Sequence, residues 1–230
     1  MEILIIRHGD PDYSIDSLTA KGWKEAELLS NKLEKIKIKE FYCSPLGRAK
    51  DTASLTLMKK NREAKVVDWL TEIGDACRDY LPSYWTEVEE YYSKDDWYKP
   101  ERIKDTYAKE MCDKVTAELD KLLAEYGYVR EGNIFRVEKE NHDRIALFCH
   151  YGVSGAILSY FTGVSPMIYW HHFVALPTSV TTLTTEERRE GIATFRISAY
   201  GDTGHLYAGG EEPAFAGRFC ECFHDDTRHD

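Results

Sequence analysis

The feature that most constrains the fold is an apolar segment at the start of the chain. Residues 2–6 read Glu-Ile-Leu-Ile-Ile and show no alternation of polar and apolar side chains. Strands that are covered on both faces have this composition, whereas strands with one solvated face alternate. Residues 144–149 repeat the pattern, and residues 176–185 and 192–200, joined by a charged turn, predict a closing pair of strands. The two apolar runs predict buried strands of a parallel sheet.

Amphipathic helices are predicted to follow these strands. After the first strand, lysine and glutamate separate apolar residues that recur at helical spacing, namely Trp23, Ala26, Leu29, Leu33 and Ile36. Residues 38–43 predict a second strand, after which Ser44 is expected as the N-cap of a helix and Pro45 as its first residue. Residues 152–161 predict a helix after the second apolar run. Strand, loop and helix in this order indicate an α/β fold.

Polar residues with reactive side chains follow the predicted strands. They are Arg7 and His8, Arg48, Glu72 and His150. Glu72 follows a short strand that is predicted at residues 66–70, and Arg48 lies in the first turn of its helix. Because open parallel α/β sheets bind ligands at the carboxyl ends of their strands, we expect these side chains to lie at one edge of the sheet.

Residues 73–143 interrupt this α/β pattern. Tyrosine and tryptophan crowd between residues 80 and 98 together with charged residues, which is unlike a strand. From Tyr107 onward an apolar stripe predicts one long helix that ends at Gly127. We therefore expect one domain over residues 1–230, in which residues 73–143 form an inserted, largely helical cap.

Composition and charge limit the classes of partner. The chain has 230 residues, 43% of them hydrophobic, which suffices for one main domain with a substantial core. Its formal net charge of −10 argues against non-specific attraction to nucleic acid or to an anionic membrane. Arg7 and His8 end the first apolar run well short of a signal-peptide core, and no run approaches the roughly 20 residues of a membrane span. We expect a soluble, cytoplasmic protein.

The six cysteines predict reduced thiols rather than a disulfide framework. They include no Cys-x-x-Cys pair, and the chain is long enough to fold without disulfides. Cys220, Cys222 and His224 lie near one another, but spacing by one residue in an acidic terminus is typical of an exposed tail. The sequence predicts no metal ion and no cofactor.

Two histidines, two arginines and one carboxylate at one sheet edge suit phosphoryl transfer. The transferred group carries negative charge on its equatorial oxygens, which Arg7 and Arg48 can bind through charge-assisted hydrogen bonds. A neutral imidazole is nucleophilic at pH 7, so either His8 or His150 could attack phosphorus. Glu72 could protonate the leaving oxygen when it carries a proton. Each residue alone could merely end a strand at the surface, so the combination carries the prediction.

Five short motifs occur in order along the chain. They are Leu-Ile-Ile-Arg-His-Gly at residues 4–9, Leu-Thr-Ala-Lys-Gly at 18–22, Cys-Ser-Pro-Leu-Gly-Arg-Ala at 43–49, Leu-Thr-Glu-Ile at 70–73 and Phe-Cys-His-Tyr-Gly at 148–152. This series resembles the motifs of the histidine phosphatase superfamily. Residues 177–183 and 204–206 are similar to its closing strands, so the resemblance covers all but the cap and the C-terminal end.

The resemblance implies a three-layer α/β/α sandwich with a mostly parallel central sheet, and a two-step reaction without a metal ion. The positions that match the family motifs are the nucleophile His8, the phosphate-binding Arg7 and Arg48, the stabilising His150 and the acid–base residue Glu72. The expected partner is a small phosphorylated substrate, with no nucleic acid and no membrane.

Two stretches differ from the family pattern. Tyr151 follows the second histidine, where the family commonly has glycine. Asp10-Pro11-Asp12-Tyr13 follows Arg-His-Gly, where many members have glutamate and then serine or threonine. The chain lacks motif features that the phosphoglycerate mutase branch carries around this loop, which favours hydrolysis of a phosphate monoester. A phosphoglycerate-type mutase is the first alternative, and a non-catalytic module that binds a phosphorylated ligand is the second.

Overall fold

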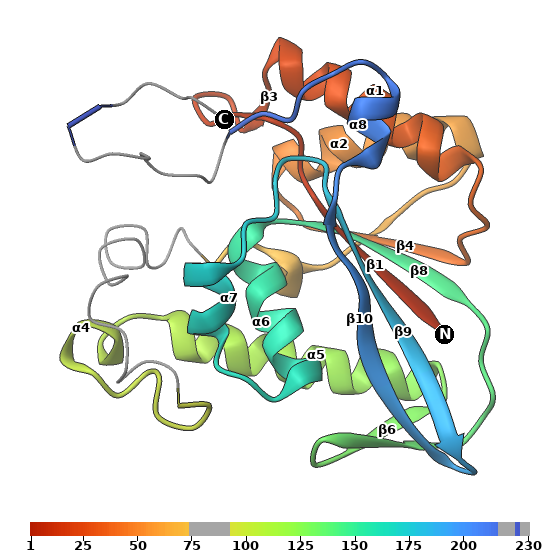
Figure 1. Ribbon diagram of the computed structural model, residues 1–230, viewed down its shortest axis with the longest axis vertical. Coiled ribbons are helices and arrows are strands. Elements are labelled where there is room, and N and C mark those ends of the chain that lie inside the picture. The colour runs from red at the N-terminus through yellow and green to blue at the C-terminus, as the bar shows by residue number, and fades with distance from the viewer. Residues whose placement is uncertain (74–92, 216–223, 226–230) are drawn as a thin grey trace.

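The fold is organised around one eight-stranded sheet (Figure 1). The computed structural model describes residues 1–73, 93–215, 224 and 225. The strands of the sheet are β1 (Glu2–Arg7), β4 (Glu40–Cys43), β5 (Lys65–Val66), β6 (Tyr128–Glu131), β7 (Ile134–Val137), β8 (Arg144–Cys149), β9 (Val180–Arg189) and β10 (Ile192–Asp202). They lie in the order β5-β4-β8-β1-β9-β10-β7-β6. The two predicted apolar strands, β1 and β8, are therefore neighbours in the middle of the sheet.

The half of the sheet from β5 to β1 is parallel, as predicted. β1 and β8 pair in a register that sets Arg7 opposite Cys149, and β4 and β8 pair with Cys43 opposite Phe148. In the other half, each strand is antiparallel to its neighbour. Because only β9 and β7 run against β1, the sheet as a whole is mostly parallel in strand direction.

The strand predicted at residues 66–70 is wrong beyond its first residue. β5 ends at Val66, and η1 (Asp68–Leu70) is a turn of 3₁₀-helix. The backbone N–H of Val67 still donates to the carbonyl of Cys43, but the next bonds close locally, from Leu70 to Val67. The chain therefore turns away from the sheet before Glu72.

Helix α2 (Gly47–Lys60) begins later than Ser44 and Pro45 predict. Its N-cap residue is Leu46, and no side chain caps its first turn. The Ser44 hydroxyl instead lies 2.7 Å from Nε2 of His150 and accepts a hydrogen bond from the backbone N–H of Leu46 at 3.3 Å. Because the hydroxyl is engaged there, it does not serve as the predicted cap.

Part of the predicted cap belongs to the main sheet. β6 and β7 form a hairpin, and β7 pairs with β10, so residues 128–137 extend the sheet. Phe135 of β7 packs edge-on against Phe195 of β10, with 4.9 Å between ring centroids. Burial of this aromatic pair explains why the hairpin joins the sheet rather than a helical cap. Residues 74–92, which carry most of the predicted aromatic cluster, lie outside the described residues.

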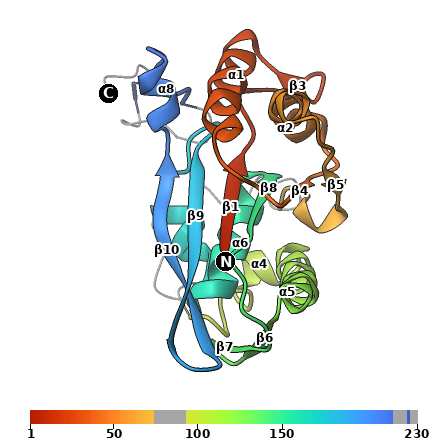
Figure 2. The same cartoon turned by 90° about the vertical axis from the view of Figure 1, so that its right-hand side faces the viewer.

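Helices cover both faces of the sheet (Figure 2). They are α1 (Ala20–Glu34), α2 and α8 (Gly204–Ala208) over one face, and α4 (Glu101–Lys104), α5 (Ala108–Glu125), α6 (Tyr151–Thr162) and α7 (Pro166–His172) on the other. The α4 and α5 helices lie in the region predicted as a largely helical cap. Among the described residues, no helix combines the length and the apolar character needed to cross a membrane.

The side chains of β1 divide between two apolar cores. Ile3 and Ile5 pack with residues of α5 and α6, whereas Leu4 and Ile6 pack with residues of α1 and α2. Alternate residues of one strand point to opposite faces, so an uninterrupted apolar strand requires cover on both sides. The predicted three-layer α/β/α sandwich is confirmed.

Helix α1 follows the predicted stripe through its middle. Ala26, Leu29 and Leu33 are fully buried. Trp23, in the first turn, is 38% exposed, and Ile36 lies beyond the C-cap residue Lys35. The Thr19 side chain caps the helix by accepting a hydrogen bond from the backbone N–H of Gly22 at 3.0 Å. The stripe therefore holds through the middle of the helix, whereas Trp23 is exposed and Ile36 packs against the same core from beyond the end of the helix.

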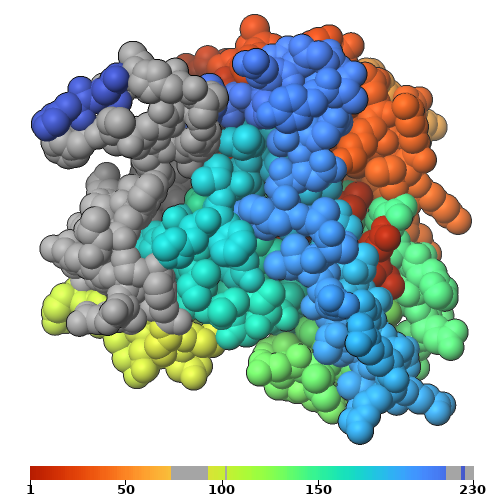
Figure 3. Space-filling model, viewed as in Figure 1, coloured from red at the N-terminus to blue at the C-terminus, as the bar shows by residue number. Residues whose placement is uncertain are grey.

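Helix α7 joins the described part of the cap region to the closing strands. Trp97 is buried and packs edge-on against Trp170 of α7, with 5.6 Å between ring centroids. Figure 3 shows α7 beside the β9–β10 hairpin on the surface of the molecule. There the ring of Phe173, at the end of α7, packs against the ring of Tyr200 of β10, with 5.2 Å between ring centroids. The buried Trp97 thus packs the described part of the cap region onto the core.

Replacing Leu33 by alanine tests the core between α1 and the sheet. Leu33→Ala should lower the free energy of unfolding by about 2–5 kcal/mol, because it removes a fully buried side chain and leaves a cavity. Met58→Ala on α2 is the control: Met58 is 70% exposed, so the change should stay within about 0.5 kcal/mol. Urea denaturation followed by circular dichroism measures both. Equal stabilities of the two variants would contradict this packing.

Candidate active site

Two histidines meet at the carboxyl ends of β1 and β8. His8 follows β1 and His150 follows β8, and the parallel register places them side by side. Their ring centroids are 5.1 Å apart, with the ring planes tilted by 55°. The backbone N–H of His8 donates to the carbonyl of Cys149 at 3.0 Å, which extends the strand pairing to the first histidine. Both side chains are buried.

The tautomer of His8 follows from its hydrogen bond. Nδ1 lies 2.7 Å from the carbonyl oxygen of Gly9. Because a carbonyl oxygen only accepts, Nδ1 carries the hydrogen, and the lone pair of the neutral ring is on Nε2. Burial, and next the positive charge of Arg7, lower the pKa of His8 well below 6.5. The ring is therefore neutral at pH 7 and presents a nucleophilic nitrogen.

His150 is held from the neighbouring strand. Its Nε2 lies 2.7 Å from Oγ of Ser44, which directly follows β4. Nδ1 of His150 is buried and has no hydrogen-bond partner among the described residues. Burial, and then the neighbouring His8 ring and the positive charges of Arg48 and Arg7, lower the pKa of His150 well below 6.5. The Ser44 contact was not predicted from the sequence, where Ser44 has the pattern of a helix cap.

Arg7 is fixed by the loop that follows α7. Its side chain is buried at the end of β1, and one terminal nitrogen donates to the carbonyl oxygen of Ala175 at 2.6 Å. The guanidinium carbon lies 5.5 Å from the ring centroid of Tyr151. Burial lowers the pKa of Arg7, but the ordinary value for arginine is so high that the group stays charged at neutral pH.

Arg48 is fixed by a carboxylate. It lies in the first turn of α2, is buried, and donates to Oδ1 of Asp16 at 2.6 Å. The other oxygen of Asp16 accepts from the backbone N–H of Gly47 at 2.6 Å. Partial burial opposes the charged carboxylate, but the hydrogen bonds from Gly47 and Arg48 prevail and lower the pKa of Asp16.

Asp16 is a site residue that sequence reasoning missed. It adopts a left-handed conformation, with φ of 48°, in the loop before α1. A Cβ atom on Gly47 would lie 2.1 Å from the carbonyl oxygen of Asp16. The only signal in the sequence is this glycine, whose missing side chain lets the loop approach the start of α2.

Glu72 lies at the start of α6. Its Oε1 accepts from the backbone N–H of Val153 at 3.0 Å and from that of Ile73 at 2.9 Å. Its charge also favours the charged form of Arg7. The structure thus brings Glu72 to the same sheet edge as the two histidines and the two arginines. We call Arg7 and Arg48 the arginine pair.

The backbone around His8 is held by two threonines. The N–H of Gly9 donates to Oγ1 of Thr52 at 2.9 Å, and the carbonyl of His8 accepts from the N–H of Thr178 at 3.1 Å. Thr178 has a left-handed φ of 55°, which is uncommon for a β-branched residue. The sequence pattern around His8 does not point to Thr52 or Thr178. Their contacts with the backbone of residues 8 and 9 are seen only in the folded chain.

Tyr151, where the sequence departs from the family pattern, faces α7. Its hydroxyl lies 2.6 Å from the carbonyl oxygen of Trp170 and 2.9 Å from that of Phe173. Burial raises the pKa of Tyr151, so the hydroxyl keeps the proton that it donates to these carbonyls. The Tyr151 side chain therefore links the start of α6 to the end of α7. Its partner Phe173 lies two residues before Ala175, whose carbonyl oxygen accepts from Arg7.

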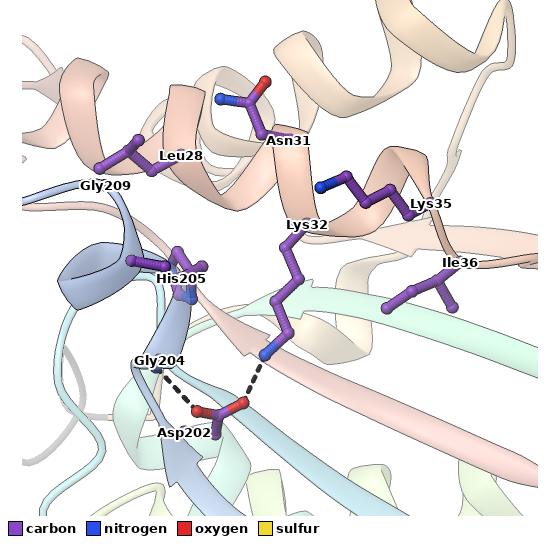
Figure 4. Close-up of a pocket in the computed structure, with 10 residues that line it drawn as sticks. Leu28, Asn31, Lys32, Lys35, Ile36, Asp202, Gly204, His205 and Gly209 are labelled. Carbon is purple, nitrogen blue, oxygen red and sulfur yellow. Dashed lines mark hydrogen bonds and ion pairs between the residues drawn. The ribbon is translucent and has the colours of Figure 1, made fainter.

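A cavity lies between α1 and α8 (Figure 4). It measures about 590 Å³ and is lined by Lys32, Asp202 and His205, among others. Lys32 and Asp202 form an ion pair there. His205 is buried, and its Nε2 lies 3.1 Å from Oγ1 of Thr178. Burial lowers the pKa of His205 to about 4.

The described residues contain no group of three or more side chains suited to hold a metal ion. Cys220 and Cys222, which the sequence analysis considered with His224, lie outside the described residues. The expectation that this tail binds no metal stays a prediction.

Comparison with known protein sequences identifies a family and one relative. A profile of the histidine phosphatase superfamily (branch 1) matches residues 3–198. A 2,3-bisphosphoglycerate-dependent phosphoglycerate mutase of Thermoplasma acidophilum is 36% identical over 81 residues. That alignment covers 31% of this chain and 40% of the relative, so the chain matches less than half of the relative's length.

Solved structures with the same fold include phosphatases and a mutase. A phosphoserine phosphatase of Entamoeba histolytica, a mutant in complex with phosphoserine, has 18% identity and a TM-score of 0.63, covering 89% of this chain and 98% of that one. A phosphoglycerate mutase of Bacillus anthracis has 17% identity and a TM-score of 0.63, covering 92% and 97%. At these identities the likeness shows the fold alone.

His8→Ala should change how stability depends on pH. Because the pKa of His8 is held well below 6.5 in the folded protein, only the unfolded chain gains a proton as pH falls through about 6.5. Below this pH the stability of wild type therefore falls by up to about 1.4 kcal/mol per pH unit on account of His8, and the variant escapes this loss. Urea denaturation at several pH values should show the stability difference move in favour of His8→Ala as pH falls.

Leu33→Ala is the control for this measurement, because it removes no titrating group. Its stability difference from wild type should stay constant between about pH 7 and about pH 5. The same constancy for His8→Ala would contradict the lowered pKa of His8.

Proposed function

The chain belongs to the histidine phosphatase superfamily, and on that premise we propose that it hydrolyses small phosphate monoesters through a phosphohistidine on His8, without a metal ion. The observation that carries the proposal is the hydrogen bond from His8 Nδ1 to the carbonyl of Gly9 at 2.7 Å. It orients the ring and leaves the Nε2 lone pair for attack on phosphorus.

The reaction has two steps that balance without a further reactant. First, the Nε2 lone pair of His8 attacks phosphorus, the bond from phosphorus to the ester oxygen breaks, and the leaving oxygen takes a proton from the carboxyl group of Glu72. Second, a water oxygen attacks phosphorus, the phosphorus–nitrogen bond breaks, and its electron pair returns to His8 while Glu72 takes a proton from the water. The products are an alcohol and inorganic phosphate.

The arginine pair and His150 would stabilise the transferred group. The two guanidinium groups supply positive charge for the equatorial oxygens, as Mg²⁺ does in many phosphoryl-transfer enzymes. His150 faces His8, and its buried Nδ1 lacks a partner among the described residues. The Ser44 hydroxyl can donate its hydrogen to Nε2 of His150 while its oxygen accepts from the backbone N–H of Leu46. Nδ1 of His150 then carries a hydrogen that can be donated to a phosphoryl oxygen.

A phosphoglycerate-type mutase is the second candidate, because a relative with 36% identity over part of its length has that name. A mutase would form the same phosphohistidine but return the phosphoryl group to a bound sugar acid. Incubation with 3-phosphoglycerate separates the two reactions. We expect release of inorganic phosphate, whereas formation of 2-phosphoglycerate without phosphate release would establish the mutase.

We also propose that the protein works in the cytoplasm. Cys43 and Cys149 are buried free thiols in the described part of the chain, as in proteins of reducing compartments. Localisation of a tagged chain by microscopy tests this, and an extracytoplasmic signal would contradict it.

The site predicts which histidine becomes phosphorylated. During turnover of a labelled monoester in the presence of a chelator, quenching into base and peptide mapping should find the phosphate on the peptide that contains His8. His8→Ala should abolish both the adduct and turnover. His150→Ala should slow turnover by about 10²–10³-fold, as expected for loss of one transition-state donor, without moving the label. Label on the His150 peptide, or activity that chelation abolishes and metal restores, would contradict the mechanism.

The leaving group reveals the proton donor. Glu72→Gln should slow hydrolysis of alkyl phosphates by about 10²-fold or more, because their leaving oxygen needs a proton in the transition state. The same variant should affect nitrophenyl phosphate much less, since that leaving group departs as a stable anion. Comparison of kcat/KM for both esters measures the difference. Equal losses would show that another group is the acid.

A further inference from the structure

Tyr13 is an exposed aromatic residue at the arginine pair. Its ring centroid lies 5.4 Å from the guanidinium carbon of Arg48, and 54% of its surface is exposed. It also contributes to the electrostatic surroundings of Arg7, where it favours the charged guanidinium. Tyr13 therefore lies beside Arg48, one of the two arginines that we assign to phosphate binding.

The loop that carries Tyr13 is anchored on both sides. It connects β2 (Pro11–Asp12) and β3 (Ser17–Leu18), which pair as a short antiparallel hairpin. Before the turn, Oδ1 of Asp12 accepts from the backbone N–H of Ser14 at 3.0 Å. After it, Asp16 binds Gly47 and Arg48. These bonds hold the backbone on either side of Tyr13, so little conformational freedom is lost when a ligand contacts the ring.

The position of Tyr13 distinguishes it from other exposed tyrosines. Tyr207 is 66% exposed on α8, where it belongs to no part of the site. Single exposed apolar residues are normal and need no explanation. Tyr13, by contrast, adjoins the guanidinium group of Arg48, which would hold the phosphoryl group, so its ring is placed to contact a group that is esterified to the phosphate. A second aromatic ring can pack against such a ring in an offset-stacked or edge-to-face arrangement.

We propose that Tyr13 contacts the leaving group and makes the site selective for aryl phosphate monoesters over small hydroxylated alkyl ones. The inference rests on the proposed function and deepens it, since it names the substrate class of the same site. A stacked aromatic pair accounts for about a fivefold preference.

Binding of two phosphonates tests the proposal without turnover. Phenylphosphonate and methylphosphonate share the anionic group, and their carbon–phosphorus bond resists hydrolysis. Isothermal titration calorimetry should show that wild type binds phenylphosphonate more tightly, and that Tyr13→Ala reduces this preference about fivefold. Tyr13→Phe should keep the preference because it keeps the ring. Tyr207→Ala, a matched exposed tyrosine, should leave both affinities unchanged.

The pattern of losses decides the role of Tyr13. If Tyr13→Ala weakened both phosphonates by one common factor, the ring would only support Arg48 and the proposal would be overturned. Unchanged selectivity in Tyr13→Ala would overturn it as well. Thermal melting should show both alanine variants folded, since each replaced side chain is exposed.

Turnover separates this inference from the proposed function. With phenyl phosphate and glycerol phosphate, Tyr13→Ala should lose about fivefold more kcat/KM on the aryl ester. If wild type released no phosphate from any ester while still preferring phenylphosphonate through Tyr13, hydrolysis would fail and the selectivity would stand. If wild type hydrolysed both esters and Tyr13→Ala kept their ratio, the selectivity alone would fail.

Discussion

The parallel register between β1 and β8 determines the geometry of the whole site. It sets Arg7 opposite Cys149, so the next residue of each strand is a histidine and the two rings lie 5.1 Å apart. The apolar cores enforce this register, because a shift by one residue would turn every side chain of β1 to the opposite face. Because the histidines directly follow the paired ends of β1 and β8, the strand register fixes their relative positions.

Positive charge buried at this edge has two consequences. The arginine pair needs compensation, which Arg7 finds in the carbonyl of Ala175 and Arg48 in the carboxylate of Asp16. The histidines respond differently, because burial and the nearby guanidinium groups lower their pKa and keep them neutral. The proposed attack on phosphorus requires a neutral His8, so the charges suited to bind an anion also keep this histidine in the form that the proposal needs.

Tyr151 shows how a departure from a family pattern is accommodated. A side chain beside the second histidine would crowd the site if it pointed inward, but its hydroxyl bonds to carbonyls at the end of α7. Its ring also lies near Arg7, whose carbonyl partner comes from the loop that follows α7. The substitution thus adds support to Arg7 and leaves the Ser44 contact of His150 in place.

The sequence by itself determined the layered fold and the edge at which the reactive side chains gather, because an uninterrupted apolar strand such as β1 must be covered on both faces. The sequence predicted the wrong role for Ser44, the wrong structure for most of residues 66–70 and the wrong place for the β6–β7 hairpin. Local patterns contain no information about a partner that is far away in the sequence. The roles of Asp16, Thr52 and Thr178 were not predicted for the same reason. Only the tertiary structure decided the tautomer of His8, the depressed pKa of both histidines and the place of Tyr13, because hydrogen bonds, burial and charge depend on distances between residues that the chain order does not contain.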